Sequence, residues 1–341
     1  MRSASRPAPA TPSHWLSRSL RARLLLPLSW LYGGLAALHR GGYRRGLRPV
    51  ARLPVPVIVV GNVVAGGAGK TPTTIAIVRH LQAQGWQPGI VSRGYGRQVA
   101  PGQDDVQAVA PDTPASLAGD EPLLMARHTG VPVFVGRRRA EAALALLARH
   151  PATDILVCDD GLQHHALARD VEICVFDERG AGNGWLLPAG PLREAWPRPA
   201  SSVPLLVLHT GQQVPAALAG SGHHARRRLA DHAVDAQGRT TPLAALRGQH
   251  LAAIAGIARP QAFFDMLAQA GLTIASQASL PDHYAFDGGI PLEHTGQTLV
   301  CTEKDAVKIW PHAPAALAVP LELEVPQAFW HELDGVLARL G

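Results

Sequence analysis

A glycine-rich stretch followed by lysine and threonine has the residue types that bind phosphate. It reads GNVVAGGAGKTP over residues 61–72 and follows a short apolar run. Glycines let backbone N–H groups converge on phosphate oxygens at a helix start, a lysine there reaches the β- and γ-phosphates, and the threonine hydroxyl holds Mg²⁺. The strict P-loop pattern has glycine where Val64 stands, so the motif is a variant, and a turn without ligand is the alternative. The phosphate-binding residues that the pattern predicts are Gly66, Gly67, Gly69, Lys70 and Thr71.

Two adjacent carboxylates, Asp159 and Asp160, follow a second apolar run. The run covers residues 155–158 and predicts a buried strand that carries the two aspartates at its carboxyl end. Doubly wound sheets bind ligands at that end, and a metal ion bound to phosphates would stabilise both carboxylates. Asp-Asp-Gly is also common in turns. With the phosphate loop upstream, we expect at least one of the pair to bind the metal together with Thr71.

Transfer of phosphate to a hydroxyl also requires a group that accepts the hydroxyl proton. The candidates are Asp120, in AGDEPLLMA, and His283, in LPDHYAFD. A carboxylate oriented or tuned by a histidine is a workable proton acceptor. Locally, however, the sequence around Asp120 is also typical of a helix start with an aspartate as N-cap. His283 is one of 16 histidines, so its position alone indicates little.

These residues need a scaffold in which strands end close to the starts of helices. Beyond residue 50, apolar runs alternate with segments of helical spacing, which predicts an α/β fold: a P-loop α/β/α domain with a parallel sheet, and a second, smaller α/β domain. The first series has strands at 57–60, 89–91, 131–135, 155–158 and 171–176, and helices at 73–84, 122–127 and 139–149. The second series has strands at 205–208, 251–255, 272–274 and 299–301, and a helix at 260–270.

The stretch PRPASSVP, residues 197–204, is the best candidate for a domain boundary. It divides the chain into a basic apolar N-terminal segment, a nucleotide-binding domain and a second domain that closes the site. The expected ranges are 1–50, 51–203 and 204–341. Residues 211–241 are polar and are interpreted as irregular surface.

The N-terminal segment concentrates the positive charge of the chain. Residues 1–50 contain nine arginines and no lysine or acidic residue, a charge of +9 against +6 for the whole chain, so the remainder carries −3. This distribution argues against nucleic-acid binding by the main domains. Residues 24–38 form an apolar run of fifteen residues between arginines, shorter than the roughly 20 residues that span a bilayer. We interpret the segment as amphipathic and bound to an anionic membrane surface; a core helix, a signal peptide and a spanning helix are the alternatives.

Eight features follow one another along nearly the whole chain: the basic apolar N-terminus and the motifs GNVVAGGAGKTP, VSRGYGR, GDEPLLMA, DDGLQHHAL, GNGWLLPAGPLREA, PDHYAF and TEKDAVK. In this order they resemble the tetraacyldisaccharide 4′-kinase family, the lipid A kinases of Gram-negative bacteria. The resemblance implies ATP- and Mg²⁺-dependent phosphorylation of the 4′-hydroxyl of a tetraacylated glucosamine disaccharide 1-phosphate. It also implies two α/β/α domains with the site between them, in a P-loop kinase at the cytoplasmic face of the inner membrane. We expect no nucleic-acid partner, and the sequence gives no sign of an obligate protein partner.

Carried over by motif, the resemblance makes Asp120 the base and His283 the group from the second domain that orients or tunes it. Asp159 and Asp160 become metal carboxylates. The arginines at 137–139 suit either phosphate binding or a solvated helix start. Further motif residues are expected to line the cleft and bind substrate: Ser92, Arg93, Tyr95, Arg97, Gln163, His164, Asn183, Arg193 and Glu194.

Two other classes of protein share some of these features. A P-loop regulatory NTPase or metal-insertion NTPase has a similar loop, and 16 histidines could suit metal binding. The histidine doublets, however, have no third ligand at a recognisable spacing. A membrane-attached binding module with an inactive nucleotide site is the other alternative, although its phosphate loop and carboxylates would be expected to have changed.

Overall fold

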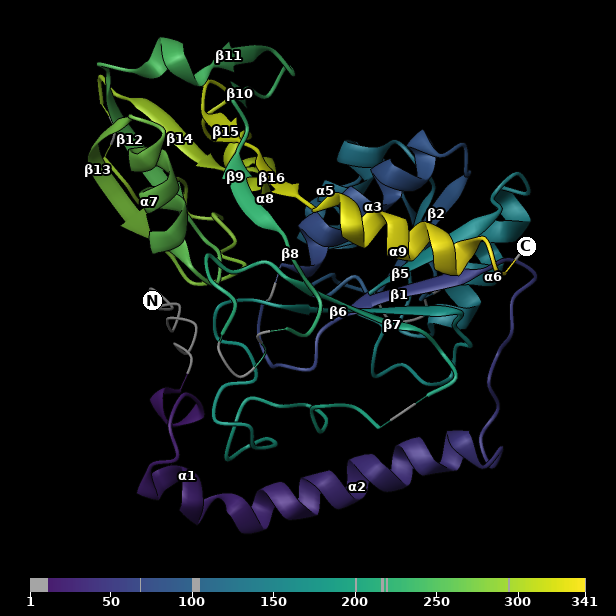
Figure 1. The fold of residues 1–341 in the computed structure, drawn as a ribbon. Helices are drawn as coiled ribbons and strands as arrows, with labels where there is room; N and C mark the ends of the chain where they lie inside the picture. Colours follow the sequence, from purple (N-terminus) through teal and green to yellow (C-terminus); the bar gives the residue numbers. More distant parts are fainter. Residues whose placement is uncertain are drawn as a thin grey trace.

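The computed structural model describes residues 12–67, 69–99, 105–199, 201–215, 218, 220–293 and 295–340. The chain forms a large α/β unit, a smaller α/β unit and an N-terminal helical segment that lies along one side of the large unit (Figure 1). A two-stranded ribbon joins the two units. The expected α/β class, with a parallel sheet and a second α/β unit, is confirmed.

The large unit is built on an eight-stranded sheet of order β3-β4-β2-β5-β1-β6-β7-β8. Neighbouring strands are parallel, except that β3 is antiparallel to β4. The central strands are buried along their whole length, which explains why they are continuous apolar runs. The strands are β1 (Val57–Gly61), β2 (Pro88–Ser92), β3 (Gln107–Val109), β4 (Val133–Val135), β5 (Ile155–Asp159), β6 (Val171–Phe176), β7 (Leu205–His209) and β8 (His223–His224).

Helices cover both faces of this sheet. One face packs against α3, α5 and α9, and the other packs against α6 and the loops that follow β5 and β6. The C-terminal helix α9 returns from the second unit to reach this core (Figure 1). The helices of the large unit are α3 (Lys70–Ala83), α4 (Ala115–Ala118), α5 (Asp120–Thr129), α6 (Arg139–Arg149) and α9 (Gln327–Leu337).

The second unit has a six-stranded sheet of order β11-β10-β15-β14-β12-β13. Helix α7 packs on one face of this sheet and α8 on the other. Its elements are β10 (His232–Val234), β11 (Thr240–Pro242), η3 (Leu243–Leu246), β12 (His250–Ala255), α7 (Pro260–Gln269), β13 (Thr273–Ser279), β14 (Thr298–Thr302), α8 (Glu303–Ile309) and β15 (Leu317–Val319). The ribbon to the large unit consists of the antiparallel strands β9 (Arg226–Leu229) and β16 (Leu321–Glu324).

The large unit extends beyond the boundary expected at residues 203 and 204. Strands β7 and β8 follow that point and belong to the large sheet, and α9 packs into its core near the end of the chain. The described part of residues 211–241 also contains β8 to β11, where we expected irregular surface. These strands have only two to four residues, and the buried side chains in and between them are small, such as Ala225, Ala230 and Ala233, so they leave no apolar run in the sequence.

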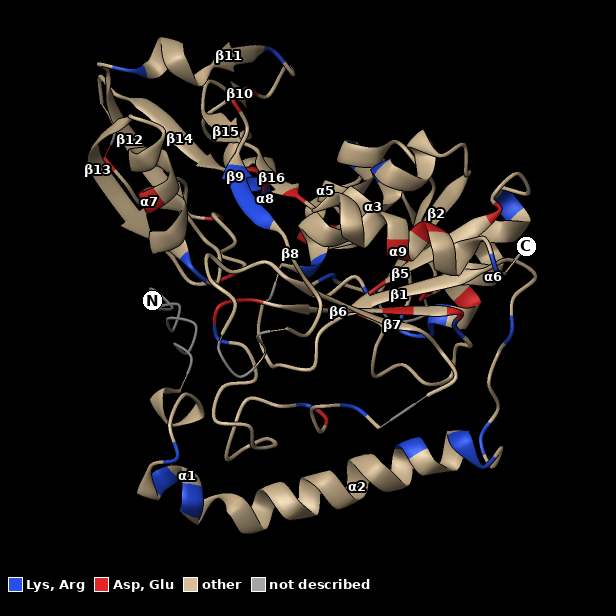
Figure 2. Ribbon diagram, in the orientation of Figure 1, with Lys and Arg blue, Asp and Glu red and all other residues tan. Residues whose placement is uncertain are grey.

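The N-terminal segment is helical and lies on the outside of the large unit. It consists of η1 (Ser13–Trp15), α1 (Leu20–Leu24) and α2 (Leu26–Arg44), and residues 1–11 lie outside the described residues. Its large apolar side chains are exposed, including Trp30 at 70% and Leu38 at 72%, so the core-helix interpretation is wrong. Arginines gather at α1 and at the far end of α2 (Figure 2). Within the described residues, no helix combines the length and apolarity needed to cross a membrane.

Candidate active site

The phosphate loop connects β1 to the start of α3, as its sequence predicts. Gly66 and Gly69 both have positive φ, +98° and +85°, and Gly69 is the residue before α3. A Cβ added at Gly69 would lie 2.5 Å from a guanidinium nitrogen of Arg227 and 2.9 Å from the hydroxyl of Thr210. Glycine is therefore required at position 69 both by the backbone conformation and by the lack of space. Ala68 of the motif lies outside the described residues.

The lysine of the loop faces the second aspartate after β5. Lys70 Nζ lies 3.5 Å from Asp160 Oδ1, and a guanidinium nitrogen of Arg193 lies 3.4 Å from the same oxygen. Arg139 is buried and donates to the Asp160 carbonyl, so this arginine of the run 137–139 does not belong to a solvated helix start. Burial alone would raise the pKa of Asp160, but Lys70 and Arg193 outweigh it and the pKa is lowered. Asp160 is thus held as a carboxylate.

The first aspartate, Asp159, is fully buried at the end of β5. Its oxygens accept hydrogen bonds from the hydroxyls of Thr74 at 3.0 Å and Ser92 at 3.3 Å. Burial, followed by the negative charge of Glu121, raises its pKa to about 7. A buried carboxylate with a raised pKa is the kind of group that a nearby cation would return to its charged form.

The oxygen donors near the loop fit a Mg²⁺ ion. Thr71, Asp159 and Asp160 offer a hydroxyl and carboxylates, the hard ligands that Mg²⁺ takes. The described residues contain no cluster of three or more His, Cys, Asp or Glu side chains that could hold a metal by themselves. Mg²⁺ commonly binds proteins through one or two carboxylates and completes its shell with water and phosphate oxygens.

The expected pair of Asp120 and His283 forms across the two units. His283 Nδ1 lies 3.0 Å from Asp120 Oδ2, although the two residues are 163 positions apart. Asp120 is the first residue of α5, while Gly119 is the N-cap and no side chain caps the helix, so Asp120 is not the N-cap. Burial would raise the pKa of Asp120, but the hydrogen bond from His283 and the charge of Lys308 lower it. The carboxylate is therefore ionised and positioned by the second unit.

Two lysines of α8, which sequence analysis did not assign, complete this cluster. Lys308 Nζ donates to Asp120 Oδ2 at 3.0 Å, and Lys304 Nζ lies 3.2 Å from His283 Nε2 and 2.9 Å from Asp282 Oδ1. Both belong to the motif TEKDAVK, where Lys304 and Lys308 are four residues apart and thus on one face of a helix. That spacing was the signal available in the sequence, but it does not indicate what the face contacts.

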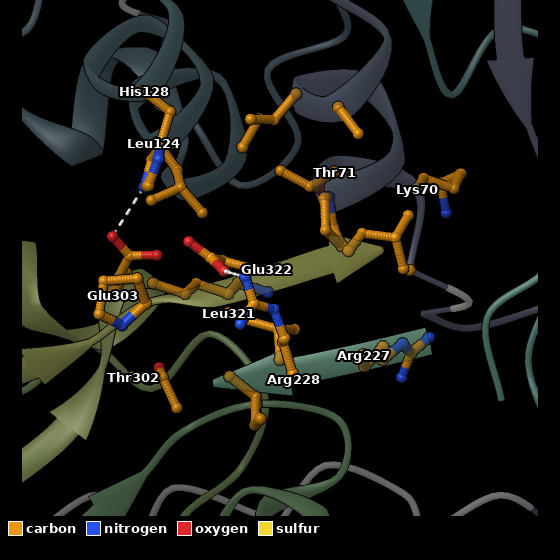
Figure 3. Close-up of a pocket in the computed structure, with 18 of the residues that line it drawn as sticks. Lys70, Thr71, Leu124, His128, Arg227, Arg228, Thr302, Glu303, Leu321 and Glu322 are labelled. Atoms are coloured by element: carbon orange, nitrogen blue, oxygen red, sulfur yellow. Dashed lines mark hydrogen bonds and ion pairs between the residues drawn. The ribbon is translucent and has the colours of Figure 1, made fainter. Parts of the chain in front are cut away.

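A cavity of about 800 Å³ lies between the two units and begins at the phosphate loop. Its walls come from α3 and α5 of the large unit, from the ribbon and from the second sheet. Figure 3 shows Lys70 and Thr71 on one side and Arg227 on the ribbon strand, with His128 of α5 joined to Glu303 of α8. The His128–Glu303 distance is 2.7 Å. The cavity is large enough for a small-molecule ligand.

Ser92 is the last residue of β2, and Arg93, Tyr95 and Arg97 belong to the loop that follows it. Ser92 is buried against Asp159, whereas Arg93 and Tyr95 are exposed, and the Tyr95 ring centre lies 5.5 Å from that of His283. Arg97 pairs with Asp105 at 2.6 Å. The structure therefore brings Ser92 and Tyr95 to the carboxylates of the site, while the Arg97 guanidinium is engaged by its own loop.

Gln163 and Glu194 form a polar pair beside α2, and His164 follows Gln163 in the loop after β5. Gln163 donates to Glu194 Oε1 at 2.7 Å, and Arg40 of α2 lies 3.4 Å from the other oxygen of Glu194. Burial, followed by the charges of Arg139 and other arginines, lowers the pKa of His164 to about 4, so this histidine is neutral. Through Gln163, Glu194 and Arg40, the loop after β5 is connected with the N-terminal segment.

Asn183 does not lie with the other candidate residues. It is buried, and its side-chain nitrogen donates to the carbonyls of His14, Ser17 and Ala189, at 2.9, 3.2 and 2.9 Å. Its oxygen accepts from the backbone N–H of Trp185 at 3.0 Å. These contacts use both donors and one acceptor position of the amide to join the N-terminal segment to the large unit.

Comparisons with known proteins identify the family. A family model described as LpxK, tetraacyldisaccharide-1-P 4′-kinase, matches residues 21–338. The tetraacyldisaccharide 4′-kinase of Acidovorax sp. (strain JS42) is 58% identical over 326 residues, covering 96% of this chain and 94% of that protein. The one from Polaromonas naphthalenivorans (strain CJ2) is 54% identical over 330 residues, with coverages of 96% and 94%.

A solved structure agrees with these relatives. The crystal structure of "apo" form LpxK from Aquifex aeolicus in complex with ATP superposes with a TM-score of 0.76 at 26% identity, covering 94% of this chain and 99% of that one. The family model and the relatives extend over nearly the whole sequence. The chain therefore belongs to the tetraacyldisaccharide 4′-kinase family, as its motifs predict.

Proposed function

We propose that this kinase transfers the γ-phosphoryl group of ATP to the 4′-hydroxyl of tetraacyldisaccharide 1-phosphate, a lipid A precursor. The observation that carries the proposal is the pair of Asp120 and His283, which come from different units and meet beside the cavity at the phosphate loop. An ionised carboxylate held by a histidine can accept the hydroxyl proton in such a transfer. A hydrolase would instead need to position water.

The transfer assigns a role to each group at the loop. The hydroxyl oxygen bonds to the γ-phosphorus as the bond to the β–γ bridging oxygen breaks, ADP leaves with the electron pair, and the proton passes to Asp120. Gly66, Gly67 and Gly69 place backbone N–H groups around the phosphates, and Lys70 contacts the β- and γ-phosphates. Bound through Thr71 and the carboxylates after β5, Mg²⁺ would neutralise charge on the phosphates.

The substrate side of the cleft is proposed from the remaining motif residues. Arg193 lies 3.4 Å from Asp160 Oδ1 and therefore borders the place where the phosphoryl group would pass. Tyr95 is exposed beside His283, so it can contact a sugar that approaches the base. The other motif residues that we propose to line or support this side are Ser92, Arg93, Gln163, His164 and Glu194.

The N-terminal segment is proposed to bind the cytoplasmic face of the bacterial inner membrane, as a peripheral or monotopic attachment. Exposed leucines and Trp30 lie along α2, and arginines flank them at α1 and at the end of α2 (Figure 2). An apolar strip of this kind, with basic residues at its ends, favours the interface of an anionic membrane. The same attachment would bring the active site to an acylated substrate.

The test is a transfer assay with purified protein, labelled ATP, Mg²⁺ and tetraacyldisaccharide 1-phosphate in detergent micelles. We expect label on the lipid with the wild type and a loss of about 10²- to 10⁴-fold with Asp120→Ala, the range that general bases contribute. Asp231→Ala is the matched control, because it also breaks an Asp–His bond of 3.0 Å but at an exposed position. ATP hydrolysis without labelled lipid would overturn the proposal and favour a regulatory NTPase.

A further inference from the structure

Of the 32 lysine and arginine residues in the chain, only three are lysines. The other 29 are arginines, including the exposed arginines that pair with Glu141, Glu322 and Asp235. All three lysines lie at the active site: Lys70 in the phosphate loop, and Lys304 and Lys308 on α8. In a chain that otherwise uses arginine for positive charge, this placement indicates positions where a compact ammonium group is needed and a planar guanidinium does not fit.

The two lysines of α8 contact the proposed base and its histidine directly. Asp120 Oδ2 accepts from Lys308 Nζ at 3.0 Å and faces His283 Nδ1 at 3.0 Å. Lys304 Nζ lies 3.2 Å from His283 Nε2. A protonated lysine has donors and no acceptor, so His283 Nε2 must be the acceptor and the ring proton must lie on Nδ1. His283 then donates to Asp120, and Oδ2 receives two hydrogen bonds.

The charges around this cluster come from three elements. Helix α5 contributes Asp120 and Glu121, the loop between β13 and β14 contributes Asp282 and His283, and α8 contributes the two lysines. Lys304 faces Glu121 at 3.7 Å as well as Asp282 at 2.9 Å. Burial would lower the pKa of Lys304, but these carboxylates outweigh it and raise the pKa. Lys304 is therefore charged, as the assignment of the histidine tautomer requires.

We propose that Lys304 and Lys308 are positioning residues for the phosphoryl transfer. Lys308 holds Oδ2 of Asp120, which leaves Oδ1 to accept the proton of the substrate hydroxyl. Lys304 fixes the tautomer of His283 in which Nδ1–H donates to the same carboxylate. The inference rests on the proposed function and adds to it the groups that keep the base ionised and oriented.

The arrangement also ties the base to the contact between the two units. Asp120 belongs to the large unit, whereas both lysines and His283 belong to the second unit, so within the described residues the partners of Asp120 Oδ2 come from across the interface. The charge of Lys308 and the hydrogen bond from His283 hold the pKa of Asp120 below its usual value against the effect of burial. With the second unit displaced, Asp120 would lose both of these partners, and its carboxylate would no longer be held in this orientation.

The first experiment measures the transfer reaction of Lys308→Met as a function of pH. We expect kcat to fall about ten- to a hundredfold, the usual effect of losing a hydrogen bond to a charged group. We expect the KM for ATP to stay unchanged and the acid limb of the kcat profile to move to higher pH. Lys308→Arg keeps the charge, so its acid limb stays in place while kcat falls. Arg239→Met is the matched control, because it breaks a 2.7 Å pair with Asp235 in the same unit.

The second experiment combines Lys308→Met with Asp120→Asn. If Lys308 acts through Asp120, the lysine change costs no further activity in the Asp120→Asn background. Equal losses in both backgrounds, or an acid limb that does not move in Lys308→Met, would overturn the proposal. If Lys308→Met fails to bind nucleotide because it does not fold, Lys304→Met is measured in the same way. A wild type that phosphorylates no lipid would overturn the proposed function instead, so the two failures are distinguishable.

Discussion

Replacing Asn183 with alanine is expected to release the N-terminal segment while leaving the two α/β units folded. The amide donates to the carbonyls of His14, Ser17 and Ala189 and accepts from Trp185 N–H. Alanine removes all four contacts. Two of the carbonyls belong to the segment that leads into α1, so the change acts on the attachment of that segment.

The size of the effect follows from the number of buried groups that lose a partner. An unsatisfied buried polar group costs about 1–3 kcal/mol, and the amide has two N–H donors and one accepting oxygen in use. Because water reaches part of this site once the segment loosens, we expect a local cost of about 2–4 kcal/mol. This corresponds to a roughly 30- to 1000-fold larger population of the detached segment.

Hydrogen exchange of residues 12–45 measures that population. We expect faster exchange there in Asn183→Ala, with exchange in β1, β5 and β6 unchanged. Gln249→Ala is the matched control, because its amide also donates to a backbone carbonyl, that of Ala245, at an exposed position of the second unit. Unchanged exchange together with a raised KM for the lipid would refute this reasoning and support direct substrate binding by Asn183.

Three further predictions concern the loop, pH and the C-terminal helix. Gly69→Ala should raise the Kd of ATP at least about tenfold, because an alanine in the left-handed conformation costs about 1–2 kcal/mol and its Cβ would contact Arg227. Gly67→Ala should have less effect, because the nearest atom to its added Cβ is Ala258 Cβ at 3.7 Å. Burial and then nearby arginines lower the pKa of His165 from 6.5 to about 4. The unfolded state therefore binds more protons than the folded state between these pH values, and stability falls as pH drops from 6.5 toward 4. Replacing this histidine, in His165→Phe, should reduce the fall in Tm between pH 7 and 5. Ending the chain at residue 325 removes the buried side chains of α9, about 6–12 kcal/mol of apolar burial, so the large unit should lose its cooperative thermal transition.

Parts of the fold were predictable because one physical rule governs them locally. Strands β1, β5 and β6 are buried on both faces, so each is a continuous apolar run whose identity does not depend on distant residues. The glycines of the phosphate loop are likewise set by backbone conformation. These features fixed the positions of Lys70 and Asp160 relative to one another, since both follow neighbouring parallel strands.

The site residues that sequence analysis missed are those whose partners lie far along the chain. Lys308 is separated from Asp120 by 188 positions, and its own helix gives only the spacing to Lys304.

Asn183 was expected at the site because it lies in a motif with residues of the site. Its side-chain nitrogen, however, donates to backbone carbonyls, which every residue type carries and no sequence pattern reveals. Motif membership therefore predicts that a residue is needed, but it does not separate contact with substrate from support of the scaffold.

The domain boundary was misplaced for a related reason, and the consequence reaches the chemistry. The chain leaves the large unit through β9 and returns through β16, so both crossings lie in one ribbon, where Arg228 pairs with Glu322 at 2.8 Å and Glu324 at 3.0 Å. The second unit is thus inserted between β8 and α9, and a division of the chain into consecutive domains cannot describe it. Because Asp120 lies in one unit and His283 in the other, their 3.0 Å contact depends on the geometry of this ribbon as well as on the packing of α8 against α5. The reactive geometry is therefore a property of how two units are joined, which neither unit's sequence specifies alone.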